Sequence, residues 1–340
     1  MEYLDFRSDT VTKPTEEMRE AARSAVVGDD VWGDDPTVQE LEAYAADLLG
    51  KEEAMFVASG TMGNVVSVLS QTNPGDEVFL EADSHIYHYE VGGISALAGA
   101  IPHLIRTEYG NVTSKQLTQE IRSENIHFPH PSLLCLENTH NRHGGTALSV
   151  SEVASPAKTA HDHGMRVHLD GARLFNASLY HNVDVKEYTK HADTVQICLS
   201  KGLSAPIGSI VASDKDTMKI ARKKRKMLGG GMRQVGIIAA PGLVALRDMR
   251  DRLIEDHRNA KKLGDGLKSL GYEVIEPQTN ILVVSTRGKF ASTEEAVKVY
   301  ESLGIGVAAF GINRVRFTTH RHIDKHIVSE VISRISQLEK

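Results

Sequence analysis

Cysteine is scarce in this sequence of 340 residues, which contains only Cys135 and Cys198. Two thiols cannot form the disulfide framework that stabilises many secreted proteins. Each cysteine also lies within an apolar run, SLLCLEN or VQICLSK. We therefore expect both thiols to be buried and reduced, as in a cytoplasmic protein.

Long apolar runs are missing as well. No stretch approaches the roughly 18 consecutive apolar residues of a membrane span. The N-terminal segment, MEYLDFRSDT, carries acids and an arginine where a signal peptide would have an apolar segment. These features argue against secretion and membrane insertion, and they favour a cytoplasmic location.

An excess of positive charge is also missing. Lys and Arg total 39 against 45 Asp and Glu, which gives a net charge of -6. This balance is the opposite of that in nucleic-acid-binding proteins, so we expect no nucleic-acid partner. Hydrophobic residues make up 41% and charged residues 25%, as in a folded globular protein. The length suggests about two domains.

Short apolar runs alternate with helix-like segments from about residue 36 onward. A helix is expected over 150–164, where the helical spacing ends at a glycine. Repeated strand and helix predict an α/β fold, with a parallel sheet covered by helices on both faces. The predicted strands are 54–59, 77–82, 131–138, 166–170, 194–200 and 208–213.

The C-terminal part has a different pattern, that of a compact α+β unit. A leucine-rich helix, a strand, a second helix from about Ser292, another strand and a closing helix follow one another. The first thirty residues are expected to be irregular. We predict an N-terminal arm at 1–15, a large domain at 16–247 and a small domain at 248–340. The apolar positions of the first and last C-terminal helices are Leu253, Leu263, Leu267, Leu270, Ile327, Val331, Ile335 and Leu338.

Residues able to bind a ligand follow several predicted strands, at the edge where open α/β sheets bind ligands. The segment 59–64, SGTMGN, opens a helix, so its backbone N–H groups and a hydroxyl could hold a phosphate. A tight strand-to-helix turn would give the same pattern. Asp170 ends another strand, where a buried carboxylate needs a cation or several hydrogen bonds, and it could equally be a structural cap.

Lys201 and His85 complete this predicted edge. A desolvated lysine has a lowered pKa and acts as an amine nucleophile, although a surface lysine just past a strand would look the same. His85 offers a flat ring that could stack on a planar ligand or move a proton, or it is an ordinary loop histidine. A phosphate cradle, a carboxylate, an amine and a flat ring together match what pyridoxal phosphate requires.

Seven long motifs resemble those of the L-threonine aldolases, pyridoxal-phosphate-dependent enzymes within the β-eliminating lyases. The similarity runs nearly end to end. It implies the fold-type-I transferase architecture, with a large domain built on a mainly parallel sheet and a smaller C-terminal α+β domain. The sequence departs from the family at Trp32, where tyrosine is frequent, and has His88 and Tyr89 in a variable segment. The motifs are DFRSDTVTKPT (5–15), GDDVWGDDPTV (28–38), SGTMGN (59–64), LENTHNRHGG (136–145), HLDGARLFNA (168–177), CLSKGLSAPIGS (198–209) and GGGMRQVG (229–236).

The resemblance assigns the cofactor site residue by residue. It implies that Lys201 forms the Schiff base with pyridoxal phosphate and that Asp170 pairs with the pyridine nitrogen. Gly60 and Thr61 are implied to hold the phosphate, and His85 to stack over the ring.

The resemblance also assigns substrate and subunit contacts. Ser8, Arg173 and Arg316 match the groups that clamp the amino-acid carboxylate, a task suited to a guanidinium. Arg173 is implied to border the cofactor too. His127 corresponds to a histidine near the substrate β-hydroxyl. Arg233 resembles an arginine that reaches the cofactor phosphate across a subunit interface, so a homo-oligomer is expected, with a tetramer implied.

The activity implied by the resemblance is aldol cleavage of L-threonine or L-allo-threonine to glycine and acetaldehyde. The catalytic residues would be Lys201, His85 and His127. The base that takes the hydroxyl proton stays open between His85, His127 and a water they hold, as does the preference between the two substrates. The alternatives are another pyridoxal-phosphate-dependent lyase, which eliminates from cysteine- or serine-like substrates, and a catalytically idle cofactor-binding protein.

The sixteen histidines invite a metal-site interpretation. Zinc sites usually combine histidine with cysteine or carboxylate at set spacing, and H-E-x-x-H is absent. The histidine pairs lie in different predicted elements, so we expect no metal. The basic run 222–226 is expected to be a solvated helix face near the cofactor phosphate. The histidine pairs are His85 and His88, His140 and His143, and His320 and His322.

Overall fold

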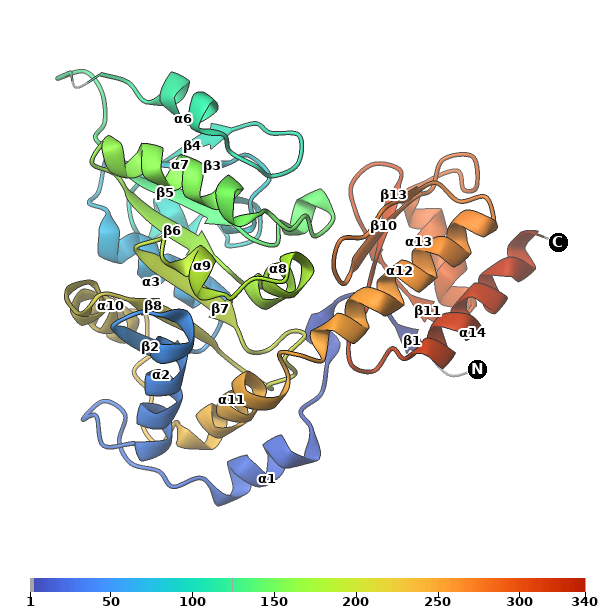
Figure 1. The fold of residues 1–340 in the computed structure, drawn as a ribbon, viewed down its shortest axis with the longest axis horizontal. Helices are drawn as coiled ribbons and strands as arrows, with labels where there is room; N and C mark the ends of the chain where they lie inside the picture. The colour runs from blue at the N-terminus through green and yellow to red at the C-terminus, as the bar shows by residue number, and fades with distance from the viewer. Residues whose placement is uncertain (1–2, 124, 340) are drawn as a thin grey trace.

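A seven-stranded sheet forms the centre of the larger part of the molecule (Figure 1). The structure is a computed structural model that describes residues 3–123 and 125–339, so residues 1, 2 and 340 of the expected arm and small domain lie outside the described residues. All six runs predicted as strands in this part form strands, and β4 is an additional one. In spatial order the strands are β2 (Glu53–Val57), β8 (Ser209–Ser213), β7 (Thr194–Cys198), β6 (Arg166–Asp170), β5 (Pro131–Glu137), β3 (Glu77–Glu81) and β4 (Ile101–Ile105).

Strand β8 runs against its neighbours. It pairs antiparallel with both β2 and β7, whereas the pairs from β7 to β4 are parallel. The expectation of a purely parallel sheet is therefore wrong at β8, while the mainly parallel sheet is confirmed. Residues 199–208, which join β7 to β8, are too few for the crossover of a dozen or more residues that parallel neighbours need. This short connection carries Lys201.

Helices cover both faces of this sheet, as predicted. Along β5, Leu134 shares a core with Val153 of helix α7. The next residue, Cys135, points to the opposite face and shares a core with Val68 of helix α3. The helix expected over 150–164 is confirmed as α7, which Ser149 caps at its N-terminus. The helices of this part are α2 (Pro36–Leu49), α3 (Gly60–Gln71), α4 (His85–His88), α5 (Gly93–Ala96), α6 (Ser114–Glu120), η2 (Asn141–His143), α7 (Val150–Asp162), α8 (Leu174–His181), α9 (Lys186–Thr189), α10 (Lys215–Met227) and α11 (Gly236–Asp248).

The N-terminal segment is more ordered than predicted. Helix α1 (Glu16–Ser24) begins after Thr15, whose hydroxyl accepts a hydrogen bond from the N–H of Met18. The expectation that the first thirty residues are irregular is wrong here. The charged sequence EEMREAARS offers only Met18 as a buried residue, and α1 packs against α11. The sequence signal for helix α1 is therefore the capping residue Thr15 and not a periodic pattern of apolar residues.

The first strand belongs to the smaller part of the molecule. Strand β1 (Leu4–Asp5) pairs in parallel with β11 (Ile305–Gly306), so the chain begins at the smaller part before it crosses to the larger one (Figure 1). Between these places lies the short helix η1 (Asp9–Val11). The segment 3–15 therefore touches both parts.

The smaller part has a four-stranded antiparallel sheet and its own hydrophobic core. Leu263, Val331 and Ile335 are buried in that core, as their spacing predicts. Leu338 is 39% exposed and lies beyond the closing helix, so its assignment to that helix is wrong. The elements are α12 (Leu253–Ser269), β9 (Val274–Ile275), β10 (Ile281–Ser285), α13 (Thr293–Ser302), β12 (Ala308–Ala309), β13 (Arg314–Thr318), α14 (Lys325–Ser336) and η3 (Gln337–Glu339).

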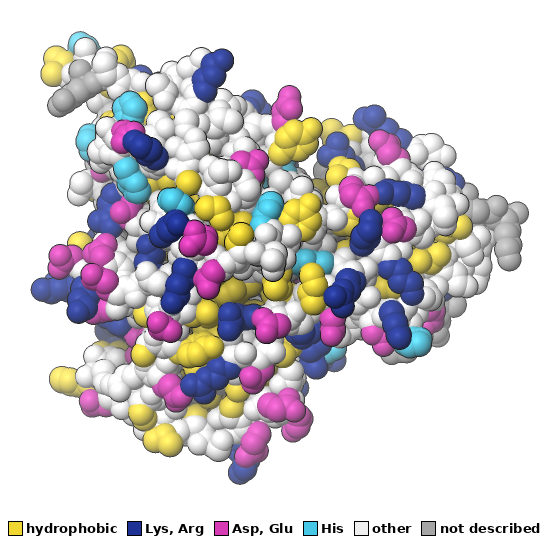
Figure 2. Space-filling model, viewed as in Figure 1, with side chains coloured by type: hydrophobic (Ala, Val, Ile, Leu, Met, Phe, Trp, Pro, Cys, Tyr) yellow, Lys and Arg dark blue, Asp and Glu magenta, His cyan; other side chains and the backbone are white. Residues whose placement is uncertain are grey.

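Side chains of both charges are interspersed on the face seen in Figure 2. The basic run on α10 is only partly solvated, because Arg225 is 5% exposed and pairs with Asp30 at 2.7 Å. Cys135 and Cys198 are buried free thiols, as predicted. Among the described residues, no helix combines the length and apolarity needed to cross a membrane.

Candidate active site

The strand ends bring four of the predicted site residues to one edge of the large sheet. Asp170 is the last residue of β6, Lys201 follows β7, His85 follows β3, and Gly60 opens α3 after β2. The charges of Asp170 and Lys201 both act on the His85 imidazole. The backbone carbonyl of Lys201 accepts hydrogen bonds from the Thr12 hydroxyl at 2.8 Å and from the N–H of Ser204 at 2.9 Å. The loop that presents Lys201 is therefore fixed by the N-terminal segment.

Asp170 is a buried carboxylate without a cation of its own. One oxygen accepts from Asn64 Nδ2 at 2.9 Å and the other from the N–H of Ala172 at 3.1 Å. No described residue forms an ion pair with it. Burial lowers the pKa of nearby His168 to about 4, so that imidazole is neutral near pH 7. A protonated pyridine nitrogen is the kind of partner that this carboxylate lacks.

The N-terminus of α3 forms a shallow cradle. Ser59 caps the helix by accepting from the N–H of Met62 at 3.2 Å, and the N–H groups of Gly60 and Thr61 have no acceptor within the helix. A Cβ atom at Gly60 would lie 2.9 Å from Cys198 Sγ, so glycine is needed for this close approach. The cradle and Asp170 fit the phosphate and the ring nitrogen of pyridoxal phosphate.

His85 is held by two carboxylates that sequence reasoning missed. Its Nδ1 lies 3.0 Å from Glu90 Oε1, and its backbone N–H donates to Glu137 Oε2 at 2.6 Å. Burial lowers the pKa of His85, but Glu90 and Asp170 outweigh it and raise this pKa above its ordinary value. Asn64 also donates to Glu90, at 2.8 Å. Asn64 belongs to the predicted segment SGTMGN and Glu137 to the motif LENTHNRHGG, whereas nothing in the local pattern singles out Glu90.

The two arginines of the predicted carboxylate clamp differ in their partners. Arg173 makes two hydrogen bonds to Asp9, at 2.8 and 2.7 Å, so its charge is already balanced. Arg316 donates to Asn141 Oδ1 at 2.9 Å and to the carbonyl of Arg7 at 3.0 Å, while its buried Nε has no partner. No described carboxylate pairs with Arg316. Its guanidinium is therefore the one able to bind an added carboxylate.

Ser8, the third predicted member of the carboxylate clamp, lies beside Asp9. The Ser8 hydroxyl is 3.5 Å from Asp9 Oδ1 and accepts from the N–H of Thr10 at 3.2 Å. Asp9 is fully buried, which raises its pKa, but Arg173 and Lys201 outweigh this effect and hold the pKa well below its ordinary value. Asp9 is a further residue that sequence reasoning missed, although it lies within the motif DFRSDTVTKPT.

His127 and Arg233 are not brought to this cluster in one chain. His127 lies before the start of β5, at the opposite edge of the sheet, and the seven residues of β5 span roughly 20 Å. Arg233 is exposed and its Nη1 donates to Asp29 Oδ2 at 2.9 Å. Among the described residues, no hydrogen bond or ion pair joins either side chain to this cluster.

The fold and this site define the class of the protein. The family model for β-eliminating lyases matches residues 5–288, and the chain belongs to that family. This membership, together with the folds of similar solved structures, confirms three predictions. The chain is a lyase, it has the fold-type-I architecture, and its cofactor is pyridoxal phosphate.

The relatives narrow the identification. A probable low-specificity L-threonine aldolase 2 of Arabidopsis thaliana is 44% identical over 97% of this chain and 95% of its own length. The low specificity L-threonine aldolase of Escherichia coli K12 is 39% identical over 96% of this chain and 97% of its own. A solved threonine aldolase of Leishmania major covers 99% of this chain and 100% of its own, with a TM-score of 0.85 at 20% identity. The resemblance seen in the motifs is thus confirmed.

Replacing Gly60 with alanine is expected to weaken binding of pyridoxal phosphate by roughly tenfold, or about 1.4 kcal/mol. The added Cβ would lie 2.9 Å from Cys198 Sγ, so the first turn of α3 must shift away from the phosphate. Equilibrium dialysis of the cofactor measures the effect. The double variant G60A/C198A removes the sulfur atom and should recover most of the affinity. An unchanged affinity in G60A would show that this turn does not hold the phosphate.

Proposed function

We propose that this chain cleaves L-threonine and L-allo-threonine to glycine and acetaldehyde, with pyridoxal phosphate as cofactor. The observation that supports the proposal is a pair of charged groups without a partner of opposite charge, the carboxylate of Asp170 and the guanidinium of Arg316, together with Lys201 after the strand that neighbours the one ending at Asp170. The first matches a cofactor ring nitrogen and the second an amino-acid carboxylate. The relatives named L-threonine aldolase support the same reaction.

Substrate orientation follows from Arg316. Its guanidinium binds the substrate carboxylate, and Ser8 lies beside the same place as a second polar contact. A fixed carboxylate would orient the bond between Cα and Cβ for cleavage. Pyridoxal phosphate supplies the electron sink for that bond.

Asp170 and Lys201, which end or follow neighbouring strands, would hold the cofactor. Asp170 would pair with the protonated ring nitrogen, and the hydrogen bonds from Asn64 and the Ala172 N–H hold its carboxylate in position. Lys201 would provide the amine that holds the cofactor.

In this proposal His85 takes the β-hydroxyl proton, directly or through a water. Its Nδ1 is engaged by Glu90, which leaves Nε2 as the exchanging nitrogen, and its side chain is 30% exposed. His127 fulfils its predicted substrate contact only if it comes from a neighbouring copy of the chain.

Glu90→Gln is expected to move the acidic limb of the pH profile of kcat/KM to lower pH, by roughly one unit. Glu90 raises the pKa of His85, so its loss lowers that pKa and the neutral, proton-accepting form persists at lower pH. Initial rates between pH 5 and 9 measure the limb. An unmoved limb would assign it to a group other than His85.

The activity is tested by acetaldehyde release from L-threonine and from L-allo-threonine, together with the absorption spectrum of the holoenzyme with and without glycine. We expect acetaldehyde from both substrates and a new long-wavelength band with glycine. Release of pyruvate from serine or cysteine without acetaldehyde would instead support the alternative lyase. A bound cofactor without any product would support the idle cofactor-binding protein.

We further propose a homo-oligomer, with a tetramer as its expected size and no nucleic-acid partner. The surface positions of His127 and Arg233 support a site shared between subunits. Trp32, in the segment that Arg233 contacts through Asp29, is 78% exposed.

The two reduced cysteines favour the cytoplasm, where the reaction would form glycine and degrade threonine. The division into domains near residue 247 is supported by the end of α11 at Asp248 and by the separate cores of the two parts.

A further inference from the structure

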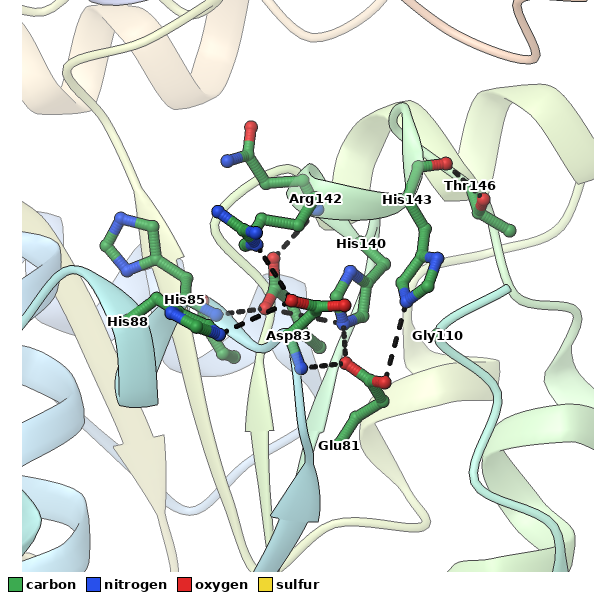
Figure 3. A network of polar contacts seen from close by, with 12 residues as sticks. Glu81, Asp83, His85, His88, Gly110, His140, Arg142, His143 and Thr146 are labelled. Atoms are coloured by element: carbon green, nitrogen blue, oxygen red, sulfur yellow. Dashed lines mark hydrogen bonds and ion pairs between the residues drawn. The ribbon is translucent and has the colours of Figure 1, made fainter. Parts of the chain in front are cut away.

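A second cluster of titratable side chains lies next to the active site. Glu81 ends β3, and its carboxylate lies between the imidazole rings of His140 and His143 (Figure 3). The neighbouring Glu137 separates this cluster from the active site. Glu137 Oε2 is 3.9 Å from His140 Nε2 and accepts the backbone N–H of His85. The reaction proposed above makes no use of Glu81, His140 or His143.

The imidazole nitrogens of this cluster lack hydrogen-bond partners. His140 is 0% exposed, and neither of its ring nitrogens forms a hydrogen bond among the described residues. The buried Nε2 of His143 has none either. His140 Nε2 approaches Glu81 Oε2 to 3.1 Å, yet this contact lacks the alignment of a hydrogen bond. Buried polar atoms without hydrogen bonds destabilise the folded protein, and a metal ion that accepts their lone pairs would remove this penalty.

The distances in the cluster match a metal site. His140 Nε2 and His143 Nε2 lie 3.1 and 3.5 Å from the two oxygens of Glu81, and the three potential ligand atoms all lie within 4.8 Å of one another. Ligand atoms about 2.0–2.2 Å from a tetrahedral zinc ion are separated by about 3.3–3.6 Å. When an imidazole and a carboxylate bind the same metal ion, their lone pairs point at the ion and not at each other. Their mutual contact is then close but poorly aligned for a hydrogen bond.

Two neighbouring groups hold the Glu81 carboxylate in place. The Thr107 hydroxyl donates to Oε1 at 3.1 Å and the N–H of Asp83 donates to Oε2 at 2.6 Å, which fixes the carboxylate as supporting groups do around metal ligands. The side chain of His143 is 15% exposed, so an ion can reach the cluster from solvent.

We propose that Glu81, His140 and His143 form a binding site for a divalent transition-metal ion, with Zn²⁺ as the best match. Two imidazole nitrogens and one carboxylate oxygen suit zinc better than magnesium or calcium, which prefer oxygen ligands only. A water would complete the coordination. From the sequence we expect no metal, because the three histidine pairs lie in different predicted elements. The structure brings a carboxylate from another strand, that of Glu81, to the pair His140 and His143.

A second group of potential ligands, His85, Glu90 and Asp170, does not carry the same inference. His85 and Glu90 are hydrogen-bonded to each other, and Asn64 bridges Glu90 and Asp170. His85 Nδ1, Glu90 Oε1 and both oxygens of Asp170 are thus engaged, although Glu90 Oε2 has no partner among the described residues, and the three residues belong to the proposed cofactor site. Saturation with pyridoxal phosphate keeps this group from binding added zinc, so the holoenzyme is the form to test.

The test is calorimetric titration of the metal-stripped holoenzyme with Zn²⁺. We expect one equivalent to bind per chain, with submicromolar affinity. In H143Q and in E81Q the affinity should fall by at least about 100-fold, since loss of a ligand exceeds the effect of losing a supporting group. His161→Gln is the matched control, because His161 forms an exposed pair with Asp193 and belongs to no cluster of this kind. Its affinity for the ion should equal that of the parent chain.

Co²⁺ in place of Zn²⁺ adds a spectroscopic readout, since tetrahedral coordination gives intense visible bands that H143Q should lose. Melting curves in chelator check that each variant is folded. If E81Q does not fold, H143Q carries the test, because its side chain is partly exposed. Absence of tight binding to the parent holoenzyme, or binding of equal affinity in H143Q, would overturn the proposal.

Discussion

Lys201→Ala is expected to abolish acetaldehyde formation, with a loss on the order of a thousandfold or more, about 4 kcal/mol in activation free energy. The amine that holds the cofactor is lost, so the absorption band of the protein-bound Schiff base should disappear as well. Thr12 and Ser204 bind the backbone carbonyl at this position, so the substitution should leave the loop in place. Acetaldehyde assays and absorption spectra of the purified variant measure both effects.

Lys219→Ala is the matched control, because this exposed lysine of α10 forms no ion pair among the described residues and lies outside the site. Its spectrum and activity should equal those of the parent chain. Retention of both the band and the activity in K201A would exclude Lys201 as the Schiff-base residue. Loss of the band with full retention of activity would exclude it as the catalytic amine.

Arg316→Leu is expected to lower kcat/KM for L-threonine on the order of a hundredfold or more, about 3 kcal/mol, while cofactor binding stays unchanged. Arg316 has no carboxylate partner, so its loss removes the attraction for the substrate carboxylate without exposing a buried acid. Burial and the nearby Arg173 both lower the pKa of Arg316, which marks a cation held in an unfavourable place. The melting temperature should therefore not fall.

Arg314→Leu provides the control from the same strand, since that side chain is exposed and lies two residues away. Arg316→Lys should recover only part of the loss, because an ammonium group cannot reproduce the paired hydrogen bonds of a guanidinium. An R316L enzyme with unchanged kcat/KM would move the carboxylate-binding role to Arg173. Weakened cofactor binding would instead place Arg316 at the phosphate or the ring.

The sequence predicts those features that depend on local order along the chain. Strand ends identify Asp170, Lys201, His85 and the segment 59–64, because side chains that follow neighbouring strands meet at one edge of a sheet. The direction of β8 could be inferred only from the short length of the connection before it. Helix α1 was missed because its sequence is charged and its one buried apolar residue gives no periodic signal.

Contacts between distant segments lie beyond such reasoning. Glu90 reaches His85 through a short loop of no particular pattern, and Asp9 neutralises an arginine 164 residues away. Glu81 looks like an ordinary strand residue in the sequence, and only the packing of β3 beside the loop after β5 places it between two histidines. A sequence motif shows which chemical groups are present, but only the folded structure shows which of them already have hydrogen-bond or ion-pair partners.

The N-terminal segment sets the alignment of the two halves of the site. Within seven residues, the carbonyl of Arg7 meets Arg316 of the smaller part, Asp9 meets Arg173, the Thr12 hydroxyl meets the backbone of Lys201, and the N–H of Lys13 meets His322. The groups proposed to bind substrate and cofactor thus contact one continuous stretch of backbone. Because the number of residues between these contacts fixes their spacing, one inserted residue between Arg7 and Thr12 would displace Arg316 relative to Lys201 without altering either side chain.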